Sequence, residues 1–301
     1  MGHSGTLEIG GREVALSNLD KVLWPENGYT KKDLIDYYVA VFPFIAPHLN
    51  QRLLVFTRYP NGIHEKSFYQ KNAPENLPDW IQTFPWAGSE GEPKHYILVN
   101  SAADLAWLAN LACIEIHPWL SPINHIEYPD FIVFDLDPSE HNSWAEIVTV
   151  ANLLKQIMDQ LGLRIYAKTS GSLGLHVYLP IVNRYTYSQV RDFGQTIAAM
   201  ICKVVPDITT IQRSVQHRGP RIYIDYLQNG LGKTICAPYS VRPRPAASVS
   251  TPIKWEELSS IDPMQFTIKT MPDRLHRHGD LFREILTDHQ QLERAKKSLG
   301  I

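Results

Sequence analysis

Two aspartates at the end of one apolar segment are the residues of this chain best suited to chemistry. Asp135 and Asp137 close the run FIVFDLD (131–137), which is rich in β-forming residues and is followed by Pro138. Side chains on a strand alternate between faces, so both carboxylates are expected on one face at the strand's end. Clustered carboxylates repel unless a cation compensates them, and hard oxygen ligands of this kind suit Mg²⁺ or Mn²⁺. The pair therefore predicts a site for divalent metal ions.

A third aspartate, Asp225, lies in the alternating segment RIYIDY (221–226), where an acidic residue runs against strand propensity. One interpretation is a salt bridge to Arg221 or Arg218. The other is a third metal ligand, because two ions about 3.5–4 Å apart can activate an attacking hydroxyl and stabilise a leaving pyrophosphate. A D-x-D pair is also usual in metal-dependent glycosyltransferases, so that class of enzyme is an open alternative.

Phosphate-binding groups are expected near these carboxylates. The turn KTSGSLG (168–174) is rich in hydroxyls and in glycines that let backbone N–H groups approach an anion, although it lacks the order of a Walker A loop. An ordinary hairpin turn is the alternative. Arg218, Arg242 and Arg244 add cations that can bind phosphate bidentately. His176 is expected on the face opposite its apolar neighbours, toward a surface or cleft, and is interpreted as a structural hydrogen-bonding residue.

The elements that must position these residues alternate between helices and strands. Strands are predicted over 131–137, 164–168, 175–179 and 221–226. Helices are predicted from Thr30 to Pro43, from Ser101 onward, from the S-x-x-E capping box at Ser143 to Gly162, over 188–205, and over 279–297. The pattern predicts a mixed α/β (α+β) fold. Residues 1–301 are expected to form one domain whose approximate subdomains, 1–120 and 121–301, flank a central catalytic cleft.

Composition sets limits on the class of protein. Of the 301 residues, 44% are hydrophobic, and no apolar stretch is long enough for a transmembrane helix. The N-terminus lacks the layout of a secretory signal, and the three separated cysteines, Cys113, Cys202 and Cys236, are expected to be reduced and packed in the interior. A cytoplasmic, nucleoid-associated protein without a membrane partner is therefore expected. The net charge of −2 counts mildly against nucleic-acid binding, but local clusters decide that question.

Seven segments in order resemble the polymerase/primase domain of bacterial ligase D, a branch of the archaeo-eukaryotic primase superfamily used in non-homologous end joining. The resemblance covers nearly the whole chain, and the segments are LSNLDKVLWPENGYTKKDLIDYY, TRYPNGIHEKSFYQKNAP, IEIHPW, FIVFDLDP, KTSGSLGLHVYLP, HRGPRIYIDYLQNG and APYSVRPRP. It implies a primase-like fold with mixed β-sheets.

The resemblance also implies roles for individual residues. Asp135, Asp137 and Asp225 would be the catalytic metal ligands for two Mn²⁺ or Mg²⁺ ions. The incoming nucleotide would be contacted by His117, Ser170, Gly171, Arg218, Gln228 and Arg242. A 5′-phosphate on the DNA would be held by Asn18, Lys21 and Lys31, with the helix N-terminus at Thr30 adding to the site. Phe68 and Tyr69 would stack on the template strand.

Two positions depart from the family pattern. Leu173 stands where the family often has lysine in SGSKG, and Thr57 stands where lysine is frequent just before Arg58. Both changes remove positive charge near the nucleotide. They leave the metal ligands intact but bear on the affinity for the triphosphate.

The function expected from residues and resemblance together is a repair polymerase that adds nucleotides, with ribonucleotides preferred, to a primer 3′-hydroxyl at gaps and breaks. Its implied partners are nucleoside triphosphates, 5′-phosphorylated DNA ends with gaps or 3′-overhangs, a DNA ligase and a Ku-like end-binding protein. The length leaves no room for a ligase or nuclease domain, so a stand-alone enzyme or one domain of a longer protein is expected. An inactive DNA-end-binding module is the non-enzymatic alternative.

Overall fold

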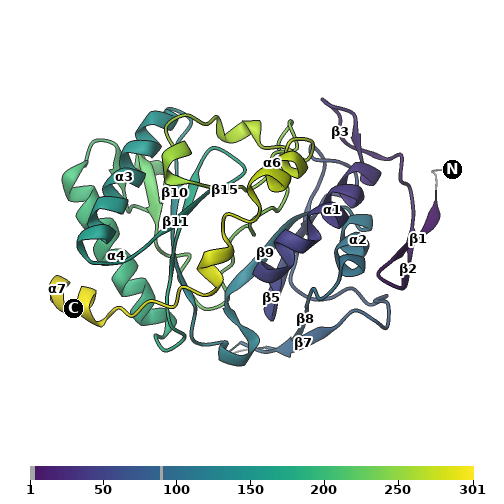
Figure 1. Ribbon diagram of the computed structural model, residues 1–301, viewed down its shortest axis with the longest axis horizontal. Helices are drawn as coiled ribbons and strands as arrows, with labels where there is room; N and C mark the ends of the chain where they lie inside the picture. Colours follow the sequence, from purple (N-terminus) through teal and green to yellow (C-terminus); the bar gives the residue numbers. More distant parts are fainter. Residues whose placement is uncertain (1–3, 89–90) are drawn as a thin grey trace. The chain divides into compact units, whose positions relative to one another are not determined.

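The apolar segment that carries Asp135 and Asp137 folds as strand β10 (Phe131–Asp137), near the middle of a six-stranded sheet. The computed structural model describes residues 4–88 and 91–301 and separates them into two units (Figure 1). Unit 1 contains the described part of Met1–Trp119 together with Cys236–Thr251 and Met264–Asp280. Unit 2 contains Leu120–Ile235, Pro252–Pro263 and Leu281–Ile301.

The sheet of unit 2 has the strand order β13-β14-β10-β12-β11-β15. All neighbouring strands are antiparallel except the parallel pair β13 and β14, so the sheet is mixed. The other strands are β11 (Tyr166–Thr169), β12 (Leu175–Pro180), β13 (Thr209–Thr210), β14 (Ile222–Asp225) and β15 (Pro252–Ile253). The helical elements of unit 2 are η1 (Ile123–His125), α3 (Trp144–Gln160), α4 (Tyr187–Val204), α5 (Val215–Arg218), η2 (Trp255–Glu257), η4 (Arg283–Leu286) and α7 (Glu293–Leu299).

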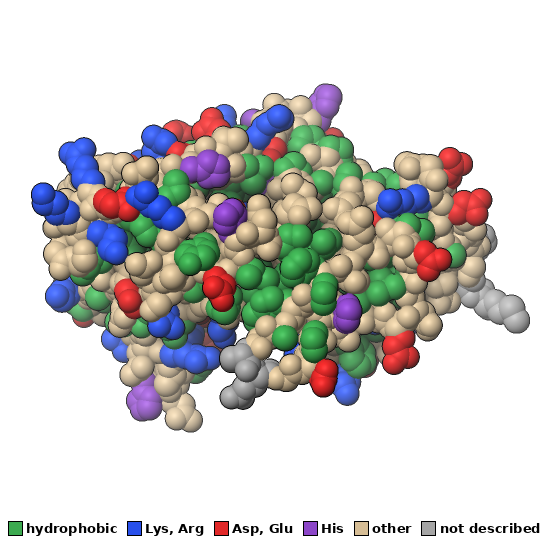
Figure 2. Space-filling view, turned by 90° about the horizontal axis from the view of Figure 1, so that it is seen from below, with side chains coloured by type: hydrophobic (Ala, Val, Ile, Leu, Met, Phe, Trp, Pro, Cys, Tyr) green, Lys and Arg blue, Asp and Glu red, His purple; other side chains and the backbone are tan. Residues whose placement is uncertain are grey.

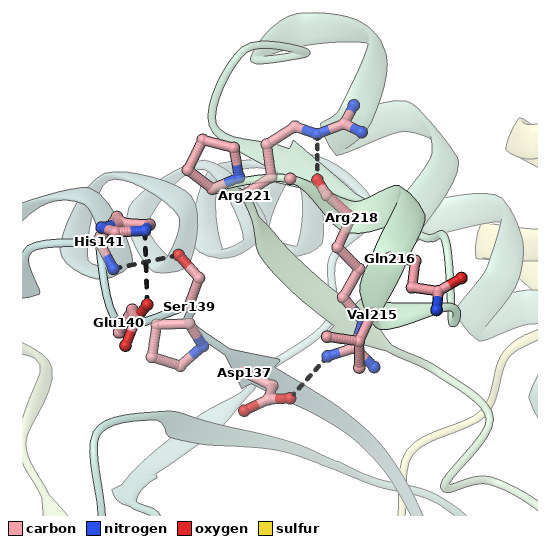
Figure 3. Close-up of a pocket in the computed structure, with 11 residues that line it drawn as sticks. Asp137, Ser139, Glu140, His141, Val215, Gln216, Arg218 and Arg221 are labelled. Carbon is pink, nitrogen blue, oxygen red and sulfur yellow. Dashed lines mark hydrogen bonds and ion pairs between the residues drawn. The ribbon is translucent and has the colours of Figure 1, made fainter.

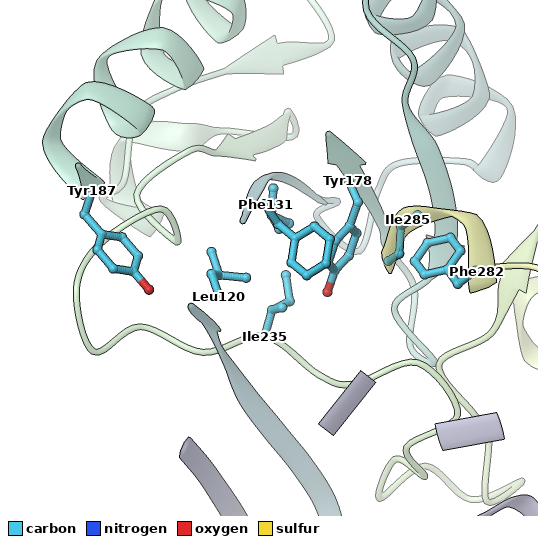
Figure 4. Packing of buried hydrophobic residues seen from close by; sticks show 8 residues of the cluster. Leu120, Phe131, Tyr178, Tyr187, Ile235, Phe282 and Ile285 are labelled. Carbon is cyan, nitrogen blue, oxygen red and sulfur yellow. The ribbon is translucent and has the colours of Figure 1, made fainter. Parts of the chain in front are cut away.

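The two faces of β10 have different environments. Helix α4 packs against β10 and lies beside α3 (Figure 1). The approach is close at Gly194 on α4, where a Cβ would lie 3.9 Å from Ile132 Cγ2. The face with the opposite parity carries Phe131 and Val133, which belong to an apolar cluster completed by Leu120, Tyr178, Tyr187, Ile235, Phe282 and Ile285 (Figure 4). Asp135 and Asp137 have this second parity, so the cluster supports the same face from which the carboxylates project.

One buried side chain extends the pairing of β10 beyond the end of β14. Asn229 is fully buried; its Oδ1 accepts from Val133 N at 2.8 Å and its Nδ2 donates to Val133 O at 2.7 Å. An amide side chain can make this pair of bonds because it carries both a donor and an acceptor. The chain that follows Asp225 is thereby fixed against the strand that carries Asp135.

Unit 1 contains a three-stranded sheet of order β6-β5-β9 and three two-stranded ribbons. Its strands are β1 (Gly5–Ile9), β2 (Arg12–Leu16), β3 (Val22–Trp24), β4 (Tyr29–Thr30), β5 (Arg52–Arg58), β6 (Phe68–Gln70), β7 (Thr83–Trp86), β8 (Lys94–Ile97) and β9 (Cys113–Pro122), the last running on into unit 2. Its helices are α1 (Lys31–Leu49), α2 (Ala102–Asn110) and α6 (Met271–His278), and η3 (Pro263–Gln265) lies at the boundary of the units.

The predicted elements agree with the structure with two corrections. Helix α1 does not stop near Pro43 but continues through Pro43 and Pro47, because Ile45, His48 and Leu49 are buried and hold the last turns in place. The predicted helix over 279–297 is broken into η4 and α7. Between them the Gln290 side chain accepts from Arg164 N and donates to Arg164 O, so tertiary hydrogen bonds replace helical ones.

Two predicted helix starts are confirmed. Capping boxes begin α2 at Ser101 and α3 at Ser143, and Gly162 follows α3 with φ of 72°. The three cysteines are free, as expected; Cys113 and Cys236 are buried, whereas Cys202 is only partly buried, so the expectation of an interior position is wrong for it. Among the described residues, no helix combines the length and apolarity needed to cross a membrane.

Candidate active site

Four ionisable residues form a row across four neighbouring strands of unit 2. Lys168 on β11 pairs in register with His176 on β12, His176 with Asp135 on β10, and Asp135 with Asp225 on β14. Residues paired in this way project from the same face of a sheet. Asp137, two residues beyond Asp135, projects from this face as well. Strand register alone therefore brings all three predicted metal ligands to one face, beside a lysine and a histidine.

Arg218 holds the most exposed of the three carboxylates. Its Nη1 lies 3.1 Å from Asp137 Oδ2, and its guanidinium stacks 4.0 Å above the ring of Tyr223. Partial burial raises the pKa of the Asp137 carboxyl; the Arg218 charge lowers it in part, and the negative charge of Asp225 adds to the rise. The Asp137 side chain is still 54% exposed, so a ligand from solvent can reach it.

Asp225 is held by its own strand and by the turn that follows. Its Oδ1 accepts from the Tyr223 hydroxyl at 3.1 Å and from Leu227 N at 2.9 Å, and its Oδ2 accepts from Gln228 Nε2 at 3.1 Å. Burial and the charge of Asp225 raise the pKa of Tyr223 well above its usual range, so the phenol is a lasting donor. The proposed salt bridge from Asp225 to Arg218 or Arg221 is absent: Arg218 pairs with Asp137, and Arg221 donates to the carbonyls of Arg218 and His217.

The chemistry of this set fits divalent cations. Three carboxylates project from one face, and carboxylate oxygens are the ligands that such cations prefer. The Asp137 carboxylate is also open to solvent. Within residues 4–88 and 91–301, however, no three acidic, histidine or cysteine side chains are already gathered in the arrangement of a metal site. The reason is visible in the contacts above, because Asp137 is turned to Arg218 and Asp225 to Tyr223 and Gln228. Binding of cations therefore requires side-chain reorientation.

The glycine-rich turn lies against the end of β10. A Cβ on Gly174 would stand 2.5 Å from Leu136 O, so only glycine fits this approach. Ser170 Oγ accepts from Ser172 N and Gly174 N, both at 3.1 Å, and Gly171 has φ of 71°. These N–H groups are used within the turn, so the Ser170 hydroxyl shapes the turn in this structure. The turn connects β11 and β12 beside the carboxylate face.

A pocket of about 630 Å³ opens beside Asp137 (Figure 3). The pocket is lined on one side by residues 137–141 and on the other by Val215, Gln216 and residues 218–221. Figure 3 shows Asp137 joined to Arg218 by their ion pair and Arg221 bonded to the Arg218 carbonyl. Two guanidinium groups give the pocket donors that suit phosphate oxygens.

Unit 1 carries a separate charged cluster around Glu115 on β9. Glu115 Oε1 lies 2.9 Å from Arg242 Nε, and Glu115 Oε2 accepts from the Tyr59 hydroxyl at 3.0 Å and lies 4.0 Å from His117 Nε2. Burial and the Glu115 charge raise the pKa of Tyr59 above its usual range. Two of the predicted nucleotide contacts, His117 and Arg242, are thus joined by a glutamate that sequence reasoning missed.

Asn18, Lys21 and Lys31 lie together at the start of α1. Asn18 takes a left-handed conformation with φ of 52°, and its carbonyl accepts from Lys21 N at 3.0 Å. Lys31 is buried, and its Nζ donates to Ser17 O at 2.7 Å. Burial lowers the pKa of Lys31, and the charges of Lys21 and Arg58 lower it further.

The helix start itself offers less to an anion than expected. The N–H groups of Lys31 and Lys32 donate to Lys21 O and Leu19 O, and Asp33 N donates to Thr30 Oγ1 in a capping box. These donors are satisfied inside the protein. The cationic side chains, rather than the helix amides, are what this place presents to a phosphate.

Phe68 and Tyr69 form an exposed aromatic pair on β6, with 48% and 59% of their surface accessible. They are therefore surface residues and not part of the core. Lys66 Nζ lies 5.6 Å from the centre of the Phe68 ring, and Arg58 Nη1 donates to Gln70 Oε1 at 3.2 Å. On the face seen in Figure 2, basic and acidic side chains are interspersed.

The predicted site residues thus fall into separate groups. One group lies in unit 2 and consists of Asp135, Asp137, Asp225, Arg218, Gln228 and the turn with Ser170 and Gly171. Two further groups lie in unit 1: His117 with Arg242, and Asn18 with Lys21 and Lys31. His176 is buried and not on a surface, because Lys168 and Asp135 flank it; its interpretation as a hydrogen-bonding residue is consistent with this place. Lys168 and Glu115 were missed because a single charge in a short strand gives no signal of its partner.

Comparison with known proteins agrees over most of the chain. Residues 30–282 match the family model "LigD, primase-polymerase domain". The chain is 35% identical to the bifunctional non-homologous end joining protein LigD of Bacillus subtilis (strain 168) over 280 residues, which are 92% of this chain and 45% of that protein. It is 31% identical to the multifunctional non-homologous end joining protein LigD of Mycolicibacterium smegmatis, covering 91% of this chain and 36% of that protein. The chain spans less than half the length of these relatives.

A solved structure agrees with the fold. The polymerase domain from Mycobacterium tuberculosis ligase D, determined in complex with DNA, matches with a TM-score of 0.84 and 30% identity. The match covers 92% of this chain and 99% of that one. The fold is therefore the archaeo-eukaryotic primase-like fold, and the glycosyltransferase alternative is set aside. The chain belongs to the LigD primase-polymerase domain family and is a nucleotidyltransferase.

Proposed function

We propose that this protein is a repair polymerase that extends a primer 3′-hydroxyl at gaps and breaks during non-homologous end joining. The observation that carries the proposal is the row of strand-paired residues that brings Asp135, Asp137 and Asp225 to one face beside an open pocket. Asp135, Asp137 and Asp225 would hold two divalent cations, Mn²⁺ or Mg²⁺. When bound, such cations supply charge neutralisation for the triphosphate and lower the pKa of the attacking hydroxyl.

The protein's own groups orient the reactants. Arg218 contacts Asp137 and lines the same pocket. Its guanidinium would therefore lie near a phosphate bound in that pocket and would stabilise charge on the transferring group. Tyr223 and Gln228 donate to the two oxygens of Asp225, and these contacts would have to change for Asp225 to turn toward a cation. Ser170 and Gly171 shape the turn beside the carboxylates, and His117 and Arg242 complete the proposed nucleotide contacts. No side chain is assigned as a general base.

The proposed DNA contacts belong to unit 1. Lys21 and Lys31, with Asn18, provide a compact positive site for the 5′-phosphate, and Arg58 adds charge next to it. Phe68 and Tyr69 are exposed aromatic platforms of the kind on which template bases stack. The proposal includes ribonucleotide preference, a cytoplasmic, nucleoid-associated place of action, and partnership with a DNA ligase and a Ku-like protein, all of which rest on family resemblance.

Primer extension on a gapped duplex tests the proposal. The assay compares a 5′-phosphorylated and an unphosphorylated gap, Mn²⁺ and Mg²⁺, and ribo- and deoxynucleoside triphosphates. Asp137→Asn is expected to abolish extension while leaving DNA binding, measured by fluorescence anisotropy, within about twofold. Asp159→Asn is the matched control, because Asp159 is an exposed aspartate of α3 in the same unit whose partner is Lys155.

Two outcomes would contradict the proposal. Tight binding to DNA ends without extension under any metal or nucleotide would support an inactive end-binding module. Extension that does not depend on Asp137 would remove the carboxylates from the mechanism. Equal use of both nucleotide classes would overturn only the ribonucleotide preference.

A further inference from the structure

Lys168 is a fully buried lysine in the core of unit 2, with none of its surface accessible. A lysine is seldom buried completely unless it is paired, because removing an ammonium from water is costly. Its Nζ lies 2.8 Å from His176 Nδ1 and 5.9 Å from the centre of the Tyr178 ring. Nothing in the proposed function uses Lys168. Its place in the register next to His176 requires an explanation.

The direction of the Lys168–His176 hydrogen bond fixes the state of the histidine. An ammonium has three donors and no acceptor, so it can only donate, and His176 Nδ1 must accept. The neutral imidazole then carries its hydrogen on Nε2. That atom lies 3.5 Å from Asp135 Oδ1, on the side of the next strand. The hydrogen is therefore directed at the carboxylate that starts the row of acidic residues.

We propose that Lys168 is a positioning residue: it locks His176 in the tautomer with hydrogen on Nε2, and His176 in turn orients the Asp135 carboxylate for cation binding. The same cross-strand register carries the whole arrangement, from Lys168 through His176 and Asp135 to Asp225. The final step, orientation for cations, rests on the proposed function. The tautomer itself does not.

The alternative arrangement is chemically distinct. A neutral Lys168 amine could accept from a hydrogen on His176 Nδ1, which would leave Nε2 without hydrogen and facing a carboxylate. Two acceptors would then face each other across 3.5 Å. The surroundings of Lys168 favour the ammonium form. The π-face of Tyr178 attracts a cation, and Asp135 and Asp225 place negative charge in the same row.

Nitrogen NMR of the imidazoles reads the tautomer directly in the unliganded protein. Signals of His176 are assigned by their loss in His176→Gln. The expected result is a non-protonated Nδ1 and a protonated Nε2, which resonate far apart. A protonated Nδ1 in the wild-type protein would overturn the proposal. In Lys168→Met, which keeps the length and removes the donor, the Nδ1 signal is expected to move; an unchanged signal would also overturn it.

Extension kinetics test the effect on Asp135. Lys168→Met is expected to raise the Mn²⁺ concentration for half-maximal extension about tenfold, the scale of lost outer partners at metal sites, while DNA affinity stays within twofold. If Lys168 acts through His176, the double variant Lys168→Met/His176→Gln is no worse than His176→Gln alone. Additive losses would overturn the positioning role. Lys155→Met, which changes a half-buried lysine on α3 whose partner is Asp159, is the control, and thermal unfolding checks the fold of each variant.

The two proposals fail in different ways. If the wild-type protein extends no primer, the repair-polymerase function fails, whereas the NMR tautomer is still measured. If extension occurs and the His176 signals do not depend on Lys168, only the positioning role fails.

Discussion

Asp135 on β10 and Asp225 on β14 lie directly opposite each other in an antiparallel strand pair. Like charges at such positions destabilise a sheet, and natural strands usually avoid them. Here each carboxylate has polar neighbours: His176 faces Asp135, and Tyr223, Gln228 and the Leu227 amide donate to Asp225. The repulsion between the two carboxylates is thus reduced but not removed. A bound cation would neutralise the remaining repulsion, so its binding would stabilise the folded protein.

The first prediction follows from this pair. Mn²⁺ should stabilise the wild-type protein against thermal unfolding, by about 2.7 kcal/mol at a hundred times its Kd, because it binds only the folded carboxylate set. Asp225→Asn should lose most of this stabilisation and lower the extension rate about a hundredfold or more, while its metal-free stability equals or exceeds that of the wild type. Differential scanning calorimetry with and without Mn²⁺, followed by EDTA, measures the two stabilities, and a primer-extension assay measures the rate. An equal Mn²⁺ shift in Asp225→Asn would exclude Asp225 from the site.

A second prediction concerns the close approach of the glycine-rich turn to β10. Gly174→Ala places a methyl group 2.5 Å from Leu136 O, where neither backbone can yield easily. The variant should lose about 1–3 kcal/mol of stability and should extend primers more slowly, because the turn moves relative to the carboxylates. Urea denaturation gives the free energy of unfolding. Gly162→Ala is a poor control because of its positive φ, whereas Gly5→Ala meets open space and should change little.

These two sites show what the chain's local patterns can and cannot reveal. The strand that carries Asp135 and Asp137 is predicted correctly, because its apolar run and the proline after it are local signals. The capping boxes at Ser101 and Ser143 place two helix starts for the same reason. The parity of one strand also places Asp135 and Asp137 on one face.

Partners that depend on register between distant strands are not predictable in this way. Lys168 meets His176 only because β11 and β12 pair in one register, and Glu115 meets Arg242 from far along the chain. The helix expected over 279–297 fails because the Gln290 side chain bonds to the Arg164 backbone, a tertiary contact with no local signature. Assignment of individual ligands to the site residues stays a prediction.

The third prediction concerns the missing lysines of the nucleotide region. Leu173 is 50% exposed, so Leu173→Lys should fold normally and lower the KM for the nucleoside triphosphate about two- to fivefold, as expected for an exposed ion pair. Thr57 is buried opposite Tyr69 on β6, so Thr57→Lys should instead cost about 1–3 kcal/mol of stability. Steady-state extension kinetics and thermal melts separate the two. A KM unchanged by Leu173→Lys would show that the turn lies outside reach of the triphosphate.

A fourth prediction uses the depressed pKa of Lys31. Its charge is lost at a lower pH than that of an ordinary lysine, so stimulation of extension by a 5′-phosphate should decline as pH rises toward 10.5, before exposed lysines titrate. The unfolded chain binds the extra proton in this window, so the free energy of unfolding should also rise with pH there. Lys31→Met should remove both pH effects at once. Chemical denaturation and gap-filling at several pH values measure them, and Lys297→Met, which changes an exposed lysine on α7, serves as the control.

The fifth prediction concerns the exposed aromatic pair on β6. Tyr69 has 59% of its surface accessible, so Tyr69→Ala should barely change stability. Loss of one base-stacking platform is worth about 1–3 kcal/mol, so affinity for a duplex with a single-stranded 3′-overhang should fall about 5- to 150-fold.

Blunt duplex without a template overhang should bind this variant almost as well as the wild type, because the stacked base is missing from that substrate. Fluorescence anisotropy with both DNA forms measures the difference. Tyr69→Phe should retain the affinity, since the ring and not the hydroxyl provides the stacking surface. Tyr128→Ala, which removes a 37% exposed tyrosine of unit 2, is the matched control and should leave both affinities unchanged. An equal loss on blunt and overhanging DNA would mean that Tyr69 contacts the duplex and not an unpaired template base.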